Sequence, residues 1–319
     1  MSRGYASVSA LIAAVRSAEP RAVGRLITLV ENESPQLREV MRQLAPDTGR
    51  AFVVGITGSP GVGKSTTTTA LVTALRATGQ RVGVLAVDPS SPFSGGALLG
   101  DRVRMQQHAL DDGVFIRSMA TRGHLGGLSV AAPQALRVFD AAGCDVVLVE
   151  TVGVGQSEVE VASAADTTLV LLAPGMGDGI QAAKAGILEI GDVFVVNKSD
   201  RDGAQALVRD LRGMIALSSR GEGDWKPVIV STVASESQGV AELLDAITAH
   251  RAHARAGAGW LARRLERARV EVAALALAQL RSELGSVPSG LSELARQVRD
   301  GTLDPYAAAD RVVDDLRRS

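Results

Sequence analysis

Residues 51–66 read A-F-V-V-G-I-T-G-S-P-G-V-G-K-S-T, and this segment specifies the class of fold. An apolar run typical of a buried strand ends in a glycine-rich turn, and a helix-forming segment follows at once. Gly58 to Ser65 matches the phosphate-loop pattern G-x-x-x-x-G-K-S. Glycines let such a loop curl until its backbone N–H groups converge on phosphate oxygens, and the next helix points its N-terminus at the same oxygens. We therefore expect a nucleotide site here.

Two side chains of this loop carry the expected chemistry. Lys64 would reach the terminal phosphates and stabilise charge during catalysis, and the Ser65 hydroxyl would ligate Mg²⁺. A plain glycine turn is the alternative, which the flanking strand and helix disfavour. The dinucleotide-binding pattern G-x-G-x-x-G fails because its third glycine is absent. The residues expected to bind the nucleotide here are Gly58, Ser59, Pro60, Gly61, Val62, Gly63, Lys64, Ser65 and Thr66.

The base is expected to be read elsewhere. The segment V-F-V-V-N-K-S-D places Asn197, Lys198 and Asp200 after a buried run, and it resembles the N-K-x-D motif of GTP-binding proteins. The Asp200 carboxylate could accept hydrogen bonds from the guanine ring N–H and amine, whereas adenine presents the wrong edge. The Lys198 stem could cover the base face. Taken alone, the motif could also be a surface turn. Residues 230–234, V-S-T-V-A, resemble the segment that closes over guanine, through Thr232, Val233 and Ala234.

A carboxylate and a glycine follow a third apolar run, in V-V-L-V-E-T-V-G. Glu150 and Gly153 stand where many such proteins have Asp-x-x-Gly. The carboxylate would act through the Mg²⁺ shell, and the Gly153 N–H could sense the γ-phosphate. Small signalling GTPases place a water-orienting glutamine after that glycine, but this chain has Val154. We therefore expect intrinsic hydrolysis to be slow, or to be completed by another group.

Two further carboxylates are candidate metal-associated groups. Asp88 in V-D-P-S-S is either such a group or a turn cap before Pro89. Asp101 follows the glycine-rich S-G-G-A-L-L-G, and that setting favours a place in the Mg²⁺ shell. Residues 119–129 are also expected to form a loop, from which Arg122 could supply positive charge to phosphate or simply be solvated.

Composition limits the classes of protein to which the chain can belong. The chain has 319 residues, 46% of them apolar, and a net charge of −1, so neither nucleic acid nor an anionic membrane is indicated as a partner. The single cysteine, Cys144, excludes an intrachain disulfide framework and fits the cytoplasm. No apolar run is long enough to span a membrane. The one close histidine pair, His250 and His253, is expected to be solvated rather than to bind metal.

The order of apolar runs and helical segments predicts an α/β fold. Six short runs suit strands buried on both faces, and helix-like segments lie between most of them, so we expect a doubly wound, mostly parallel sheet. The runs are F-V-V-G-I, V-G-V-L-A-V, V-V-L-V, T-L-V-L-L, V-F-V-V and V-I-V. The predicted parts are an N-terminal helical extension at 1–48, a P-loop domain at 49–257 and a C-terminal helical dimerisation region at 258–319.

The two helical ends have their own signals. Pro20 can open a helix, and Ser34-Pro35 looks like a cap followed by proline at the first helical position. The face of that next helix would hold Leu37, Val40, Met41 and Leu44. Near the other end, residues 258–284 predict one long helix. The segment G-S-V-P-S-G predicts a break after it, and Asp304-Pro305 predicts the start of a last helix. The long helix would pack on the core or on a second subunit through Trp260, Leu261, Leu265, Val272 and Leu275.

Together these segments resemble the GTPases associated with methylmalonyl-CoA mutase, the MeaB/ArgK type of P-loop GTPase. The resemblance rests on G-I-T-G-S-P-G-V-G-K-S-T, V-D-P-S-S, D-R-V-R-M, R-S-M-A-T-R-G-H-L-G-G-L, V-E-T-V-G-V-G-Q-S-E and N-K-S-D. It implies a homodimer that hydrolyses GTP, gates adenosylcobalamin loading and protects a partner mutase. It also implies that Asp88, Asp101 and Glu150 are metal-associated and that the loop from Asp178 to Lys184 is a switch.

Two other functions stay open. One is a kinase that transfers the γ-phosphate to a protein or small molecule, although no acceptor-binding constellation is evident. The other is a non-hydrolytic scaffold that nucleotide merely stabilises. Direct metal delivery, which relatives perform with cysteine or histidine clusters, is disfavoured by one cysteine and four histidines.

Overall fold

The computed structural model describes residues 5, 7–89, 106–108, 110–121, 131–151, 163–176, 187–217, 221, 223–257, 259–285 and 288–318. The chain forms two compact units, Met1–Arg263 and Arg264–Ser319.

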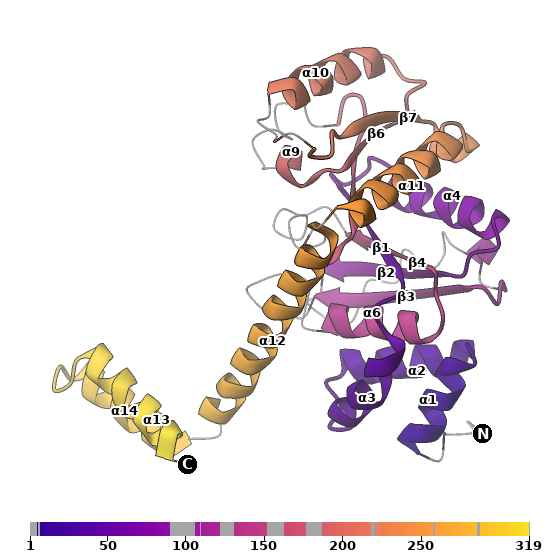
Figure 1. Ribbon diagram of the computed structural model, residues 1–319. Helices are drawn as coiled ribbons and strands as arrows, with labels where there is room; N and C mark the ends of the chain where they lie inside the picture. Colours follow the sequence, from indigo (N-terminus) through magenta and orange to yellow (C-terminus); the bar gives the residue numbers. More distant parts are fainter. Residues whose placement is uncertain are drawn as a thin grey trace. The chain divides into compact units, whose positions relative to one another are not determined.

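A parallel sheet is the centre of the first unit (Figure 1). Within the described residues it has seven strands in the order β3-β2-β4-β1-β5-β6-β7. Every neighbouring pair is parallel, so the predicted doubly wound sheet is confirmed. The strands are β1 (Phe52–Gly58), β2 (Val82–Pro89), β3 (Val114–Thr121), β4 (Val146–Thr151), β5 (Thr167–Leu172), β6 (Val193–Asn197) and β7 (Val228–Thr232).

Continuous apolar runs form the central strands because both faces of those strands are covered. Every residue of β1, β4, β5 and β6 is buried. The six predicted runs are all strands, but β3 was missed. Its sequence V-F-I-R-S-M-A-T is interrupted by Arg117 and Ser118, which an edge strand tolerates. The prediction of a loop at 119–129 is wrong for Met119–Thr121, which pair with Val87–Pro89 of β2.

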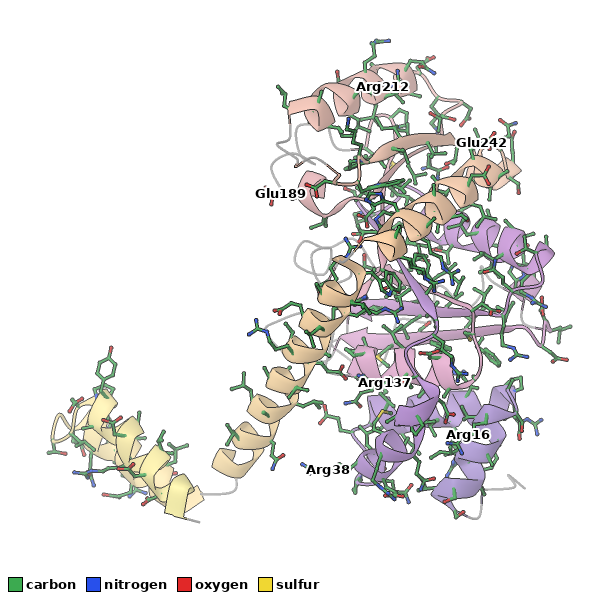
Figure 2. All side chains as sticks on the ribbon, viewed as in Figure 1. Arg16, Arg38, Arg137, Glu189, Arg212 and Glu242 are labelled. Atoms are coloured by element: carbon green, nitrogen blue, oxygen red, sulfur yellow. The ribbon has the colours of Figure 1, made fainter. Side chains whose placement is uncertain are left out.

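Helices cover the two faces of the sheet. On one face lie α4 (Lys64–Ala77) and α11 (Val240–Ala256), which bury residues such as Leu71 and Leu243 against the strands. On the other face lie α6 (Ala131–Ala141) and α10 (Ala204–Leu217). Polar side chains face away from the sheet, as Arg212 on α10 and Glu242 on α11 show (Figure 2). The short elements are η1 (Ala45–Asp47), η2 (Gln106–His108), α9 (Ile187–Ile190) and η3 (Ala234–Glu236).

Three N-terminal helices pack beside α6: α1 (Val8–Arg16), α2 (Pro20–Glu31) and α3 (Leu37–Leu44) (Figure 1). Pro20 opens α2 as predicted. The predicted cap at Ser34-Pro35 is wrong, because α3 begins two residues later than that signal implies. Ser34 instead closes a turn, in which its hydroxyl accepts from the Gln36 N–H at 3.3 Å. The predicted apolar face is confirmed: Val40 and Leu44 are buried, and Leu37 and Met41 pack beside them.

The long helix α12 (Gly259–Gly285) begins in the first unit, where Trp260 stacks on Phe52 with ring centroids 5.8 Å apart. Core packing is thus confirmed for Trp260. It is wrong for Leu261, which is 73% exposed. Leu265, Val272 and Leu275 belong to the second unit and are 72%, 66% and 41% exposed.

The second unit continues α12 and adds α13 (Pro288–Arg299) and α14 (Pro305–Arg318), which pack on each other. The predicted break G-S-V-P-S-G is wrong for 288–290, which begin α13. The predicted start at Asp304-Pro305 is confirmed, because Asp304 Oδ1 accepts from the Tyr306 and Ala307 N–H groups at 3.0 Å. Among the described helices of both units, none is long and apolar enough to cross a membrane.

Candidate nucleotide site

The predicted site residues that the structure describes lie at the carboxyl ends of the central strands. The phosphate loop follows β1, Glu150 lies near the end of β4, and Asn197 ends β6. Because β1 pairs with both β4 and β5, and β5 pairs with β6, these ends share one edge of the sheet. Open α/β sheets bind their ligands at this edge.

The phosphate loop has the conformation that its glycines allow. Gly63 has a left-handed φ of +101° and caps α4, whose first residue is Lys64. A Cβ at Gly63 would overlap the side-chain amide of Asn197, so only glycine lets the loop approach that residue so closely. Lys64 is buried, and its ammonium donates to the carbonyls of Gly58 at 2.7 Å and Ser59 at 3.1 Å. Lys64, which is expected to bind the phosphates, therefore lies inside the curve of the phosphate loop.

Glu150 joins β4 to the first turn of α4. Its buried carboxylate accepts from the Ser65 hydroxyl at 2.6 Å and from the Thr68 hydroxyl at 2.8 Å. The two residues predicted to associate with Mg²⁺ thus place a hydroxyl and a carboxylate oxygen side by side. Hard oxygen donors of this kind are what Mg²⁺ prefers, so the residues present fit the ion.

Asn197 joins the phosphate loop to the base-reading segments. Its Nδ2 donates to the Val62 carbonyl at 2.9 Å. Its Oδ1 accepts from the Thr232 hydroxyl and from the Ala234 N–H, both at 3.1 Å. Three predicted segments that are far apart in sequence therefore meet on one buried amide, and Val233 is buried beside them.

Lys198 turns back from the end of β6 toward the phosphate loop. Its backbone has a left-handed φ of +56°, which is uncommon for a residue with a side chain. Its ammonium donates to the Gly61 carbonyl at 2.7 Å and lies 3.7 Å from the Met176 sulfur. Asp200 is exposed in the turn that follows. The parts that Lys198 and Asp200 play toward guanine remain predictions.

Several predicted residues lie outside the described part of the chain. These are Asp101, Arg122, Gly153, Val154 and the loop from Asp178 to Lys184. The backbone of Asp88 lies at the end of β2, paired with Ala120, while its side chain is outside the description.

Two residues near the site were missed. Thr68 lies three residues after Ser65, on the same face of α4, and this helical spacing could have identified it as a second partner of Glu150. Met176 lies in P-G-M-G, directly after the β5 run, and its position at a strand end was the available signal.

The expectation that His250 is solvated is wrong. His250 is buried on the inner face of α11, with Nδ1 2.7 Å from the Thr167 hydroxyl and Nε2 3.2 Å from an Asp192 carboxylate oxygen. Thr167 begins β5 and Asp192 precedes β6, so this cluster lies at the amino ends of the strands, away from the nucleotide edge. His253 is exposed, as expected.

Comparison with known proteins agrees with this geometry. The family described as methylmalonyl-CoA mutase-associated GTPase MeaB matches residues 23–288. A Pyrococcus abyssi protein that carries a GTPase name is 45% identical over 313 residues, which cover 97% of each chain. GTPase ArgK of Escherichia coli is 39% identical over 249 residues, covering 76% of this chain and 75% of ArgK. The crystal structure of an LAO/AO transport system kinase is 25% identical, with a TM-score of 0.73 over 99% of this chain and all of that one.

The parallel sheet, the loop from Gly58 to Ser65 and these relatives define a P-loop GTPase. More than half of the chain matches a single family within that class. The chain belongs to the methylmalonyl-CoA mutase-associated GTPases, the MeaB family.

Proposed function

We propose that this GTPase gates the loading of adenosylcobalamin onto methylmalonyl-CoA mutase and protects the mutase from inactivation. The observation that carries the proposal is the match of residues 23–288 to a family named for its association with that mutase. The cofactor would bind to its partners, so this chain needs only the nucleotide site and a surface for the mutase. Its cycle would use GTP and GDP as the signal.

In this proposal different groups of described residues bind different parts of the nucleotide. The backbone N–H groups of the loop, which Pro60 lacks, and the Lys64 ammonium hold the β- and γ-phosphates and stabilise charge on them. Asp200 pairs with the guanine edge, and Lys198 covers the base. Thr232, Val233 and Ala234 line the base on the other side. The Asn197 bonds to the Val62 carbonyl and the Ala234 N–H support this division, because they hold the two halves in register.

Mg²⁺ would be held by Ser65 and Glu150, with Asp88 and Asp101 as further candidates from the sequence. When bound, the ion would neutralise charge on the β- and γ-oxygens. Glu150 also orients the Ser65 hydroxyl, and Thr68 restrains the second carboxylate oxygen. The carboxylate is therefore preorganised at the start of α4.

The basal rate is proposed to be low. Val154 stands where a water-orienting glutamine would stand. Gly153 would report the γ-phosphate, and the loop from Asp178 to Lys184 would carry that state to the mutase. The mutase would then stimulate hydrolysis by completing the site.

The proposal includes a cytoplasmic homodimer. Residues 258–319 would form the dimerisation region, 49–257 the GTPase domain and 1–48 a helical extension. Support comes from α12, where Leu261, Leu265, Val272 and Leu275 lie on one face and are exposed. Apolar faces of this kind are typical of surfaces that another chain covers. The one cysteine, Cys144, is buried and free, which suits a reducing compartment.

Cofactor transfer to the mutase tests the proposal. Apo-mutase, adenosylcobalamin and this protein are mixed with GTP, GDP or a non-hydrolysable GTP analogue, and the cobalamin retained on the re-isolated mutase is measured by its absorbance. We expect retention to depend on which nucleotide is present and to lose that dependence with Lys64→Ala. Equal retention with every nucleotide would contradict gating. Full protection by a folded Lys64→Ala protein would favour the scaffold.

The kinase alternative has one observation behind it, the likeness of this chain to a protein named as an LAO/AO transport system kinase. Phosphate release from GTP into water, with no acceptor present, would exclude phosphoryl transfer as the main activity. Label from γ-³²P-GTP that stays on a protein or small molecule would favour it.

A further inference from the structure

We propose that Met176 is a positioning residue for the guanine-nucleotide site, which it holds in shape through Gly61 and Lys198. This inference rests on the proposed nucleotide function and extends it to a residue outside the recognised motifs. Met176 would set affinity for the nucleotide without touching the reacting atoms.

The strand order places Met176 between the two halves of the site. β5 lies between β1, which leads into the phosphate loop, and β6, which leads into Asn197 and Lys198. After β5 the chain turns back: the Met176 N–H donates to the Ala173 carbonyl at 3.3 Å, and Gly175 has a left-handed φ of +73°. The side chain of Met176 therefore starts from the middle of the edge where the nucleotide would lie.

Met176 packs on the phosphate loop at Gly61. Gly61 has a left-handed φ of +82°, and a Cβ built on it would lie 2.5 Å from the Met176 methyl carbon. The thioether methyl thus occupies the space that any larger residue at Gly61 would need. This contact packs the segment after β5 against the phosphate loop.

Met176 also contacts Lys198. The Lys198 ammonium donates to the Gly61 carbonyl at 2.7 Å, and the Met176 sulfur lies 3.7 Å from the same nitrogen. A thioether is only a weak acceptor, so Met176 contributes mainly a packing contact beside the ammonium; the bond between the ammonium and the Gly61 carbonyl is itself exposed.

The backbone of Lys198 is strained. A left-handed conformation costs a residue with a Cβ about 1 kcal/mol or more, and such residues persist where the surroundings hold them. The φ of +56° directs Lys198 back toward Gly61, where the carbonyl and Met176 retain it. The three residues together fix the spacing between the phosphate loop and the base motif.

A fixed spacing favours binding because the free protein already has the bound shape. GDP and GTP share the base, the ribose and the β-phosphate, so loss of Met176 should weaken both equally. The γ-phosphate chemistry should be little changed once the site is filled.

Titrations of fluorescent GDP and GTP into Met176→Ala, Met176→Leu and wild-type protein test this role. Met214→Ala is the matched control. Met214 is also half-buried, but it lies on α10 and packs against the apolar cluster beneath that helix, away from the site. We expect Met176→Ala to raise both dissociation constants about tenfold while kcat at saturating GTP stays within about twofold. Met176→Leu should restore most of the affinity because it keeps the apolar volume. Met214→Ala should bind as the wild type does.

Melting of the nucleotide-free proteins separates positioning from general destabilisation. The inference predicts that Met176→Ala and Met214→Ala melt at similar temperatures yet differ in affinity. It is overturned if Met176→Ala binds both nucleotides as the wild type does, or if Met214→Ala loses as much affinity. A wild-type protein that binds neither nucleotide would instead refute the proposed function on which the inference rests.

Discussion

The side-chain nitrogen of Asn197 lies 2.9 Å from the carbonyl oxygen of Val62, and this bond joins the base motif to the phosphate loop. The other end of the same amide holds Thr232 and Ala234. One buried side chain thus sets the positions of three segments that are far apart in sequence. Loss of that side chain should therefore disturb all three.

Asn197→Ala should weaken both the fold and the site. It leaves the Val62 carbonyl, the Thr232 hydroxyl and the Ala234 N–H without this partner, and unsatisfied buried groups cost about 1–3 kcal/mol each. We expect urea denaturation to show a loss of about 2 kcal/mol or more, and GDP binding to fall further than the stability alone explains. Gln205→Ala, on the exposed face of α10, is the control and should change neither. Unaltered GDP affinity in a folded Asn197→Ala protein would refute the joining role.

Glu150→Gln should change the response to Mg²⁺. The amide keeps an oxygen for the Ser65 hydroxyl but removes the negative charge that a divalent ion requires. We expect the Mg²⁺ concentration for half-maximal GTP hydrolysis to rise about tenfold or more. GDP affinity measured without Mg²⁺ should change little. Glu242→Gln on the outer face of α11 serves as control, and an identical Mg²⁺ titration for Glu150→Gln and wild type would exclude Glu150 from the metal site.

Trp260→Ala should destabilise the first unit. Trp260 stacks on buried Phe52, and the Arg255 guanidinium lies 5.5 Å above the indole. Aromatic pairs and cation–π contacts contribute about 0.5–1.5 kcal/mol each, in addition to the apolar area they bury. We expect a loss of about 2 kcal/mol in urea denaturation, followed by the remaining Trp225 fluorescence. Leu217→Ala is the comparison, because that leucine is 86% exposed. Equal midpoints for the two variants would show that the stack is dispensable.

Leu265→Glu should dissociate the proposed homodimer. At about 3.6 residues per turn, Leu265 shares a face of α12 with Leu261 and Val272, while Val270 lies on the opposite face. Leu265 is 72% exposed and Val270 58% exposed, so Val270→Glu is a control of similar exposure on the same helix. Sedimentation equilibrium should give a monomer for Leu265→Glu and a dimer for Val270→Glu. If only Val270→Glu dissociated the dimer, the interface would have to lie on the face of α12 that contains Val270.

The ion pair between Arg76 and Asp111 predicts an acid-dependent loss of stability. The Arg76 guanidinium, and then the Gly113 N–H, lower the pKa of Asp111 below its ordinary value of 3.8. A carboxyl whose pKa is lower when folded stabilises the protein above its unfolded pKa, and the effect disappears as the pH falls through the folded value. Asp111→Asn should therefore cost about 0.5–1 kcal/mol at neutral pH, since the pair is partly exposed. The unfolding free energies of the two proteins should converge as the pH falls below 3.8 and through the lower pKa of Asp111 in the folded state. Asp112→Asn, next in the chain and exposed, is the control; a difference that persists in acid would assign the effect to packing.

Much of the fold could be predicted because it is encoded locally. The strands that are buried on both faces are continuous apolar runs, and glycine spacing specifies the phosphate loop. β3 could not be found in this way, because Arg117 interrupts its pattern. In the folded protein the Arg117 guanidinium lies against Gly24 of α2, at the place where a Cβ would overlap it. This contact is tertiary, and the two residues are far apart in the chain.

The candidate site, like the fold, has some features that local motifs predict and others that only tertiary packing specifies. The motifs predict Ser65, Glu150 and Asn197 as site residues, but they do not show that the Asn197 amide contacts both the phosphate loop and the segment 230–234. His250 was misjudged because A-H-R-A-H-A-R looks like a solvated helix surface. Its burial follows from where α11 crosses the starts of β5 and β6, a position that no local pattern specifies.

Hydrolysis of GTP and ATP by the purified protein, with and without methylmalonyl-CoA mutase, is the sharpest test of the proposed function. We expect slow turnover that is selective for GTP and rises when the mutase is added. Equal turnover of GTP and ATP would contradict the recognition of guanine by Asp200. GTP-selective turnover that is indifferent to the mutase would contradict the proposed partnership.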